Sequence, residues 1–239
     1  MKKKGLAICC AGDQSLHERW SGPGRAFDLF VIYFGDAEGK WRGSADYYMQ
    51  GKGVKLHLIH DAMEAYPDIF SKYDTIFCPD DDIDTDTRTV NQIFRCFNAY
   101  PLALAQPALT RRSHIAHPML RQKRFSFLRY TNFVEVMVPI MTKEVFYHLS
   151  SSFKLNKTAW GIDYLWASMV QEAGLGNIAI LDAYPVTHTR PVNVHGGYYK
   201  TLNLDPWADL SRLMEEFGLS TEQRVYKNVY KFLGWHIMV

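Results

Sequence analysis

Four short apolar runs in the N-terminal third of the chain constrain its fold more than any other feature. Each run is followed at once by turn or acidic residues. In chain order they cover 5–10, 27–34, 54–60 and 75–78. Short runs bounded in this way are typical of buried strands in a mostly parallel sheet. The segments 44–50 and 62–73 between them are long enough for short helices, so the pattern predicts the alternating strands and helices of an α/β domain.

Helix and strand signals continue along the rest of the chain. Helical spacing of apolar residues predicts one helix between Asp86 and Pro101 and another over 161–172. Asp205-Pro206 predicts the start of a third helix that ends near Gly218, and a last helix is expected over 220–233. Extended segments are expected at 102–106, 130–141 and 177–181. Because no repeat or low-complexity linker interrupts the sequence, we expect a single domain over 1–239.

Composition excludes several classes of protein. The 239 residues carry a net charge of only +2, and 47% are hydrophobic, which argues against a disordered chain or a strongly basic nucleic-acid binder. No apolar run approaches the roughly 18 residues of a transmembrane helix, and the apolar stretch after Met1 is too short for a signal peptide. The four cysteines lack C-x-x-C spacing, so we expect reduced core thiols and a cytoplasmic protein.

The acidic turn after the fourth apolar run is the most informative stretch. Asp80, Asp81 and Asp82 are consecutive, and neighbouring carboxylates repel one another unless a cation or water relieves them. Hard oxygen ligands suit Mg²⁺ or Mn²⁺, usually shared with substrate phosphates. An EF-hand is excluded because Thr87 and Ile93 occupy the positions of its glycine and glutamate. A solvated turn that caps the next helix remains the alternative.

An Asp-x-Asp motif directly after the fourth strand of an α/β half resembles the GT-A glycosyltransferases. Further stretches resemble a less studied glycosyltransferase-like family, the domain of unknown function seven-hundred-and-seven. They are residues 15–20, 27–29, 33–36, 132–137, 160–166 and 186–191. The resemblance implies a GT-A-like α/β fold, with a mixed, mostly parallel sheet flanked by helices. It further implies a nucleotide-sugar half over 5–110, an acceptor and metal half over 111–204, and C-terminal helices over 205–239.

The same resemblance implies a metal and a donor substrate. Asp80 and Asp82 would hold Mn²⁺ or Mg²⁺ on the diphosphate of a nucleotide-sugar, expected to be a UDP-sugar. His188 matches the late histidine that often completes such sites, and a neutral imidazole suits Mn²⁺ beside carboxylates. A hydrogen-bonded loop histidine is the alternative. Arg190 is expected to neutralise phosphate charge, or else to pair with Asp182.

Two carboxylates are candidates for the catalytic base. Asp163 opens the helix expected over 161–172, where the helix dipole also favours an acid. A carboxylate within reach of an acceptor hydroxyl would remove its proton as the oxygen attacks the sugar, and the resemblance implies an acid in this Trp-Gly-x-Asp context, with Trp160 stacking on the acceptor. Glu135 is the second choice, because a lone carboxylate in the otherwise apolar strand expected over 133–140 must be paired or face a cleft.

Other acidic residues follow the expected N-terminal strands. Asp13, Asp36 and Asp61, together with Asp81, are candidates for nucleotide binding, because ligands gather at the carboxyl ends of parallel strands. Ordinary turn chemistry explains aspartates at such positions equally well. The chain has no G-x-G-x-x-G and no Walker A sequence, which leaves dehydrogenase and P-loop interpretations without support.

Two basic segments suggest anionic partners. Residues 107–134 contain no acidic residue, and their basic loop is expected either to contact donor phosphates or an anionic acceptor, or to be solvated. The expected last helix interleaves Arg224, Lys227 and Lys231 with aromatic residues. It would either pack on the core or touch the inner face of a membrane, where lipid-linked acceptors are found.

These observations predict a hexosyltransferase-like enzyme that moves a sugar from a nucleotide-sugar to a hydroxyl acceptor, a glycan or a glycolipid. The alternative is a non-catalytic carbohydrate- or nucleotide-binding protein on the same scaffold, since a fold does not fix function.

Overall fold

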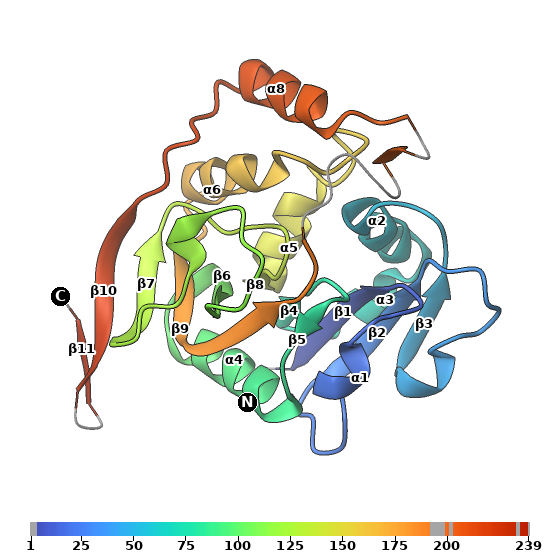
Figure 1. Cartoon of the computed structure of the whole chain (residues 1–239), viewed down its shortest axis with the longest axis horizontal. Coiled ribbons are helices and arrows are strands. Elements are labelled where there is room, and N and C mark those ends of the chain that lie inside the picture. Colours follow the sequence, from blue (N-terminus) through green and yellow to red (C-terminus); the bar gives the residue numbers. More distant parts are fainter. Residues whose placement is uncertain (1–3, 192–198, 201–202, 233–234, 239) are drawn as a thin grey trace.

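The computed structural model describes residues 4–191, 199–200, 203–232 and 235–238. A single mixed sheet forms its centre, with the strand order β11-β10-β7-β9-β6-β8-β4-β1-β2-β3 (Figure 1). The strands are β1 (Gly5–Ala11), β2 (Asp28–Tyr33), β3 (Tyr47–Gln50), β4 (Thr75–Phe77), β6 (Leu102–Leu109), β7 (Ser126–Thr131), β8 (Ile140–Thr142), β9 (Asn177–His188), β10 (Val225–Phe232) and β11 (Trp235–Met238). A short strand outside this order, β5 (Ile83–Asp84), pairs with β9.

The two halves of the sheet are paired differently. Strands β3, β2, β1 and β4 run parallel to one another. Strand β8 lies between β4 and β6 and runs antiparallel to both. Beyond it β9 is parallel to β6, whereas β7, β10 and β11 pair antiparallel. The predicted mixed α/β sheet is confirmed, with continuous parallel pairing confined to the N-terminal half.

Helices cover both faces of the sheet. They are α1 (His17–Trp20), α2 (Lys55–Ala65), α3 (Pro67–Phe70), α4 (Thr87–Ala99), α5 (Lys143–Ser150), α6 (Ile162–Glu172) and α8 (Pro206–Glu216), with 3₁₀ turns η1 (Arg42–Ser44) and η2 (Pro118–Leu120). In Figure 1, α1 and α4 lie below the sheet, and α2, α5 and α6 lie above it. Strand β1 shows why both faces need cover. Ala7, Cys9 and Ala11 belong to one core, and alternate residues such as Ile8 belong to the other.

Two predictions for the N-terminal half are wrong, because a predicted strand is a helix and a predicted helix contains a strand. The apolar run 54–60, predicted as a strand, forms the start of helix α2. The segment 44–50, predicted as a helix, begins with the last residue of η1 and contains the edge strand β3. Leu56, Ile59 and Ala62 are buried at helical spacing, so packing on the sheet selects the helix. The runs at 5–10, 27–34 and 75–78 are strands as predicted, and the helices expected after Asp86, near 161–172 and after Pro206 are also confirmed.

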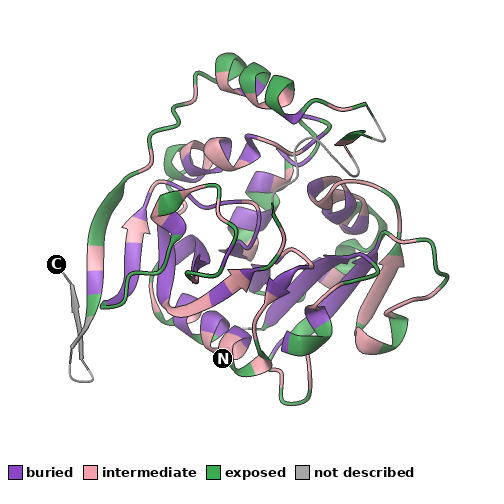
Figure 2. Ribbon diagram, viewed as in Figure 1, coloured by how far each residue is buried: buried purple, intermediate pink, exposed green. Residues whose placement is uncertain are grey.

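The predicted last helix over 220–233 is wrong as well. This segment instead contains strand β10, which pairs antiparallel with β7 and covers the edge that β7 would otherwise expose. Val229 is buried there, and the next residue, Tyr230, is 39% exposed, as expected where successive side chains of a strand point to opposite faces. The membrane contact predicted for a basic helix loses its structural basis. Helix α8 and β10 carry much exposed surface, whereas the central strands are buried (Figure 2).

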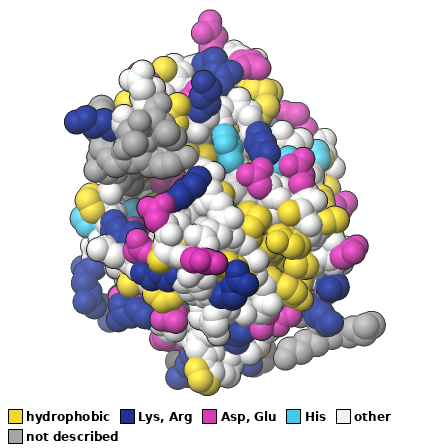
Figure 3. Space-filling view, turned by 90° about the vertical axis from the view of Figure 1, so that its right-hand side faces the viewer, with side chains coloured by type: hydrophobic (Ala, Val, Ile, Leu, Met, Phe, Trp, Pro, Cys, Tyr) yellow, Lys and Arg dark blue, Asp and Glu magenta, His cyan; other side chains and the backbone are white. Residues whose placement is uncertain are grey.

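The described cysteines, all four in the chain, are free and buried, as predicted. Among the described residues no helix has both the length and the apolar character needed to span a membrane. Acidic and basic side chains are interspersed on the face seen in Figure 3, which suits the small net charge.

Candidate functional site

Two acidic residues and one histidine meet where the acidic turn touches the end of β9. Asp80 and Asp82 lie in the turn after β4, and His188 is the last residue of β9. The antiparallel pairing of β5 with β9 sets Ile83 opposite His188 and thereby brings the imidazole to the turn. One ligand atom from each of the three side chains lies within 4.8 Å of the others. The structure therefore assembles the three residues that the sequence predicted as metal ligands.

Asp82 and His188 form a buried pair. His188 Nε2 lies 3.1 Å from Asp82 Oδ2, and the other ring nitrogen, Nδ1, lies 2.8 Å from the carbonyl oxygen of His114. Burial lowers the pKa of His188, but the hydrogen bond and the charge of Asp82 outweigh it and raise the pKa to about 9. Asp82 Oδ1 is buried and has no hydrogen-bond partner within the described part of the chain. An orphaned carboxylate oxygen beside an imidazole fits a divalent cation.

Lys55 is a member of the site that the sequence analysis missed. Its ammonium donates to Asp80 Oδ1 at 2.6 Å and to the carbonyl oxygens of Val136 and Met137 at 2.8 and 3.0 Å. Burial raises the pKa of Asp80, and the charge of Lys55 opposes that shift. Lys55 begins helix α2, a segment that the sequence assigned to a strand. The available signal was a lysine in a mostly apolar run, which needs a partner when buried.

Asp81 is not part of the three-residue cluster and connects two loops. Its Oδ2 accepts from the backbone N–H of Gly12 at 2.8 Å, and its Oδ1 accepts from Arg190 Nη1 at 3.1 Å. Arg190 also donates to the carbonyl oxygen of Gln14 at 2.6 Å. Arg190 therefore pairs with Asp81 and not with Asp182, the alternative that the sequence left open. Burial raises the pKa of Asp81, and the Gly12 hydrogen bond and Arg190 lower it.

Glu135 and Asp163 line a cavity of about 580 Å³ beside the cluster. Burial is the main cause that raises the pKa of Glu135 to about 8, and the charges of Asp163 and Asp80 add to it. Burial likewise raises the pKa of Asp163 to about 6. Glu135 Oε2 is buried without a hydrogen-bond partner among the described residues. The cavity also reaches Lys55, so the carboxylates and the cluster share one space.

Glu135 does not lie in a strand, contrary to the prediction for 133–140. The expected extended segment 130–141 is split, because β7 ends at Thr131 and β8 begins at Ile140. Glu135 lies in the loop between them, and its backbone N–H donates to Gln106 Oε1 at 2.7 Å. Asp163 is in the first turn of α6 as predicted.

The other residues predicted to bind the nucleotide lie on separate elements and do not form one cluster. Asp13 follows β1, accepts from Tyr33 Oη at 2.6 Å and pairs with Lys40 at 2.9 Å. Asp36 follows β2, and its side chain is 95% exposed beside Lys52. Both lie after strands as predicted. The expectation that Asp61 follows a strand is wrong, because it lies within α2.

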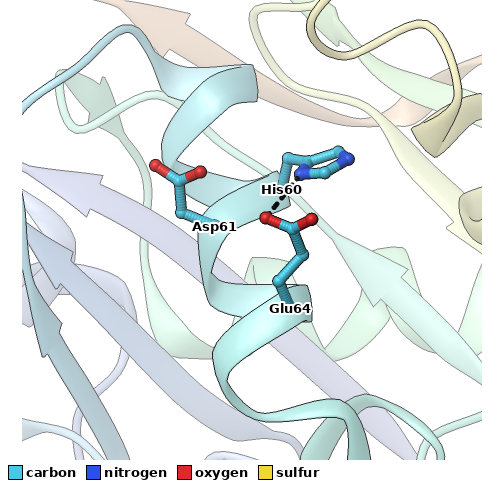
Figure 4. Close-up of side chains that lie close together, drawn as sticks. All are labelled: His60, Asp61 and Glu64. Carbon is cyan, nitrogen blue, oxygen red and sulfur yellow. Dashed lines mark ion pairs between the residues drawn. The ribbon is translucent and has the colours of Figure 1, made fainter.

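Asp61 belongs to a second cluster, with His60 and Glu64 (Figure 4). His60 Nδ1 lies 3.4 Å from Glu64, and a carboxylate oxygen of Asp61 lies within 4.8 Å of the ligand atoms of both residues. Lys154 Nζ contacts Asp61 at 2.6 Å and Glu64 at 3.6 Å. This half-exposed group is already compensated by a lysine, and exposed acidic clusters carry little weight as metal sites.

The basic segment 107–134 is held by a buried ion pair. Arg129 donates from Nε and Nη2 to Asp182 at 2.7 and 3.0 Å, and it also donates to the carbonyl oxygens of Met119 and Arg121. Within this segment, His117 reaches the cavity, and burial lowers its pKa. The remaining basic side chains of the loop are not among the residues that line the cavity.

Comparisons with known proteins support the fold. The crystal structure of GalNAc-T7 with UDP, GalNAc and Mn²⁺ is similar to this chain with a TM-score of 0.63 and 8% sequence identity. The match covers 89% of this chain but 48% of that chain, so this chain spans about half the length of the enzyme. At this identity the likeness shows the fold alone.

The family comparison adds the sequence relationship. No curated protein matches the chain. The model of a family described as "Protein of unknown function (DUF707)" matches residues 63–228, well over half of the sequence. The resemblance noted in the sequence is thus confirmed for the family, although the stretches before residue 63 lie outside the matched segment. The chain belongs to the DUF707 family.

Proposed function

We propose that this protein is a metal-dependent glycosyltransferase of the GT-A type, which moves a sugar from a nucleotide-sugar to a hydroxyl acceptor. The observation that carries the proposal is the convergence of Asp80, Asp82 and His188 beside a cavity that is also lined by the carboxyl groups of Glu135 and Asp163. The fold is consistent with it, since GalNAc-T7 was crystallised with UDP, GalNAc and Mn²⁺.

The cluster fits a divalent cation by its chemistry. Two carboxylates and an imidazole are suitable ligands for Mn²⁺, and the orphaned Oδ1 of Asp82 offers a lone pair that no described residue uses. We propose that Asp80, Asp82 and His188 hold Mn²⁺ or Mg²⁺. When bound, such an ion supplies positive charge against the diphosphate of the donor. Lys55 fixes the orientation of Asp80 and adds a second positive charge at the same place.

The donor is proposed to lie along the carboxyl ends of β1 and β2. Asp13 and Asp36 lie at these ends, and Asp81 and Arg190 connect the end of β1 to the end of β9. The Arg190 guanidinium is suited to a phosphate oxygen, because it is planar and permanently charged. A UDP-sugar is the proposed donor. Asp61 has no part in this site, since it lies within α2 and pairs with Lys154.

Asp163 is proposed as the catalytic base. With a pKa raised by burial to about 6, Asp163 is mostly ionised at neutral pH and still basic enough to take a proton. The acceptor hydroxyl gives its proton to this carboxylate while its oxygen forms a bond to the anomeric carbon. The bond from that carbon to the donor phosphate breaks, and its electron pair leaves with the nucleoside diphosphate. Glu135, with a pKa raised by burial to about 8, is mostly protonated at neutral pH and is proposed to donate a hydrogen bond to the acceptor. In a retaining reaction Asp163 would instead position the acceptor.

A second candidate function is a non-catalytic carbohydrate- or nucleotide-binding protein. The observation in its favour is that the cluster carries its own compensating charges. Lys55 pairs with Asp80, and His188 pairs with Asp82. A site balanced in this way binds ligands without a cation.

Thermal unfolding in the presence of nucleoside diphosphates separates these candidates. A ligand at a hundred times its Kd adds about 2.7 kcal/mol, which at this chain length raises the Tm by about 5–10 °C. We expect such a shift with one diphosphate in Mn²⁺, its loss in EDTA and in Asp82→Ala, and its retention in Asp84→Ala. Asp84 is the matched control, because it lies in β5 directly after the turn and pairs with Arg19 outside the cluster.

A shift that persists in EDTA would favour the binding protein over the transferase. If no nucleoside diphosphate shifts the Tm of the wild-type protein in Mn²⁺, the proposed donor site is refuted.

A further inference from the structure

The cavity has an aromatic wall in addition to its carboxylates. This wall contains Trp160, Tyr164, Tyr199 and Trp207, and Leu210 closes it at helix α8. Trp207 is 50% exposed although it lines a cavity, and it is the only exposed tryptophan whose surroundings the structure describes. Large aromatic side chains lose little conformational entropy when they bind, so an uncovered indole in a cavity is a typical contact surface for a ligand.

Backbone contacts hold the two tryptophans in place. Asp209 of α8 accepts hydrogen bonds from the backbone N–H groups of Lys157 and Thr158 at 3.1 and 3.0 Å, and from Thr158 Oγ1 at 2.8 Å. Gly161 permits close approach of this loop to α8, because a Cβ there would lie 2.8 Å from Leu210 Cδ1. Its φ of +84° also favours glycine. The aromatic wall is therefore a built surface rather than a loose contact.

The indole rings leave part of their surface open. The centroids of Trp160 and Trp207 are 5.3 Å apart with an interplanar angle of 63°, so the rings meet edge to face and do not stack on each other. Trp160 Nε1 donates to Tyr199 Oη at 3.2 Å, which fixes the plane of that indole. Ring surface thus remains available for a flat apolar group.

The carboxylates of the cavity require a hydrogen-bonding ligand. Glu135 is 8% exposed and lines the cavity, and its Oε2 is without a partner in the described part of the chain. A buried oxygen left unpaired costs free energy until a ligand or water satisfies it. Asp163 lies on the same cavity and presents a second carboxyl group.

A pyranose ring can pack on the aromatic side chains and hydrogen-bond to the carboxyl groups at the same time. Its hydroxyl groups lie around the rim of the ring, and its axial C–H groups form an apolar face that packs on an indole. We propose that the acceptor is itself a sugar, whose ring packs on Trp207 and Trp160 while its hydroxyls hydrogen-bond to Glu135 and Asp163. This inference rests on the proposed transferase function and specifies the class of its acceptor. An acyl chain would leave Glu135 unpaired, and a serine side chain would leave the indoles uncovered.

Isothermal titration calorimetry with simple sugars tests the inference. The probes are the methyl pyranosides of glucose, galactose, mannose and N-acetylglucosamine, together with lactose, maltose and chitobiose. Each is titrated into the protein with and without UDP and Mn²⁺. We expect one stereochemical series to bind, and its Kd to rise about tenfold in Trp207→Ala, which corresponds to the loss of one good aromatic contact.

Control variants separate contact from folding. Trp207→Tyr should recover part of the affinity, because it restores an aromatic face. Phe217→Ala should bind as wild type, because Phe217 is an exposed aromatic residue just beyond the end of α8 and outside the cavity. Trp207→Ala should keep the N-cap of α8, since Asp205 accepts from the backbone of residue 207.

The same variants distinguish the two proposals. Absence of sugar binding by the wild type in both conditions, or unchanged binding in Trp207→Ala, would overturn the sugar acceptor. If the Mn²⁺-dependent nucleotide shift survives either of those results, the transferase proposal stands without it. Sugar binding that depends on Trp207 in a protein that binds no nucleoside diphosphate would support the aromatic subsite and refute the transferase.

Discussion

Replacement of Glu135 by glutamine is expected to make the protein more stable at pH 8 and less able to bind its ligand. The side chain is buried, and one of its oxygens has no partner in the described part of the chain. Burial together with the charges of Asp163 and Asp80 raises its pKa from 4.5 to about 8. Glutamine has nearly the same shape as a protonated glutamate but cannot ionise, so the variant isolates the cost of the charge.

The sign and size of the effect follow from that pKa. The folded protein holds the Glu135 proton more tightly than the unfolded chain, so the free energy of unfolding falls as the pH rises between 4.5 and about 8. The slope is about 1.4 kcal/mol per pH unit, which gives about 5 kcal/mol over the whole window. Glu135→Gln should have almost the wild-type stability at the acid end and should gain most of this amount at pH 8.

Urea unfolding of both proteins at several pH values between 5 and 8 measures the effect. EDTA is included so that bound metal does not alter the electrostatics. Glu38→Gln is the control, because Glu38 is exposed in a loop, where a substitution changes stability by less than about 0.5 kcal/mol. A difference between Glu135→Gln and wild type that stays constant with pH would refute the reasoning, as would a loss of stability at pH 8. The same variant should bind sugars more weakly, which is the expected trade of function against stability.

Two further substitutions test a buried ion pair and the hydrogen bonds that attach α8 to the neighbouring loop. Arg129→Met should destabilise the protein by about 3–5 kcal/mol in urea unfolding, because it leaves Asp182 buried and unpaired. The double variant Arg129→Met with Asp182→Leu should recover much of this loss. A loss below about 1 kcal/mol in Arg129→Met would contradict the prediction. Asp209→Ala removes three hydrogen bonds between α8 and the loop at 157–158, so we expect a loss of about 1–3 kcal/mol and weaker sugar binding in calorimetry. Glu215→Ala, an exposed change on the same helix, is its control, and equal sugar binding by Asp209→Ala and Glu215→Ala would argue against α8 as a wall of the site.

The wrong secondary-structure predictions share one physical cause. In the run 54–60, apolar residues at 54, 56 and 58 alternate like a strand, while Leu56, Ile59 and Ala62 repeat like a helix. In Val225–Phe232, Tyr226 and Tyr230 have helical spacing, but the same residues also fit a period of two. The local sequence of a short segment with both periods is compatible with a helix and with a strand, so tertiary contacts determine which of the two forms. Helix α2 packs its apolar residues against the sheet, and β10 pairs with the edge of β7 that would otherwise be unpaired.

The site shows the same division between local and distant information. Asp80 and Asp82 follow a strand directly, so the carboxyl-edge argument reaches them from the sequence. His188 arrives through the pairing of β5 with β9, which spacing does not reveal, and only the family resemblance pointed to it. Lys55 was hidden by the wrong assignment of its segment. Trp207 follows an N-cap and a first-turn proline, and nothing local distinguishes an indole that lines a cavity from one that faces solvent.

The three consecutive aspartates of the acidic turn are not equivalent once the fold is formed. Asp80 forms an ion pair with Lys55. Asp81 forms an ion pair with Arg190 and accepts a hydrogen bond from the backbone N–H of Gly12. Asp82 pairs with His188 through one oxygen and keeps the other, Oδ1, buried and without a partner among the described residues. Repulsion within such a run would be costly if all three carboxylates faced one point, and here fixed cations draw two of them toward different sides. The unpaired oxygen belongs to the side chain that pairs with His188, and His188 lines the cavity, so the turn leaves its unused hydrogen-bonding capacity beside the proposed metal position.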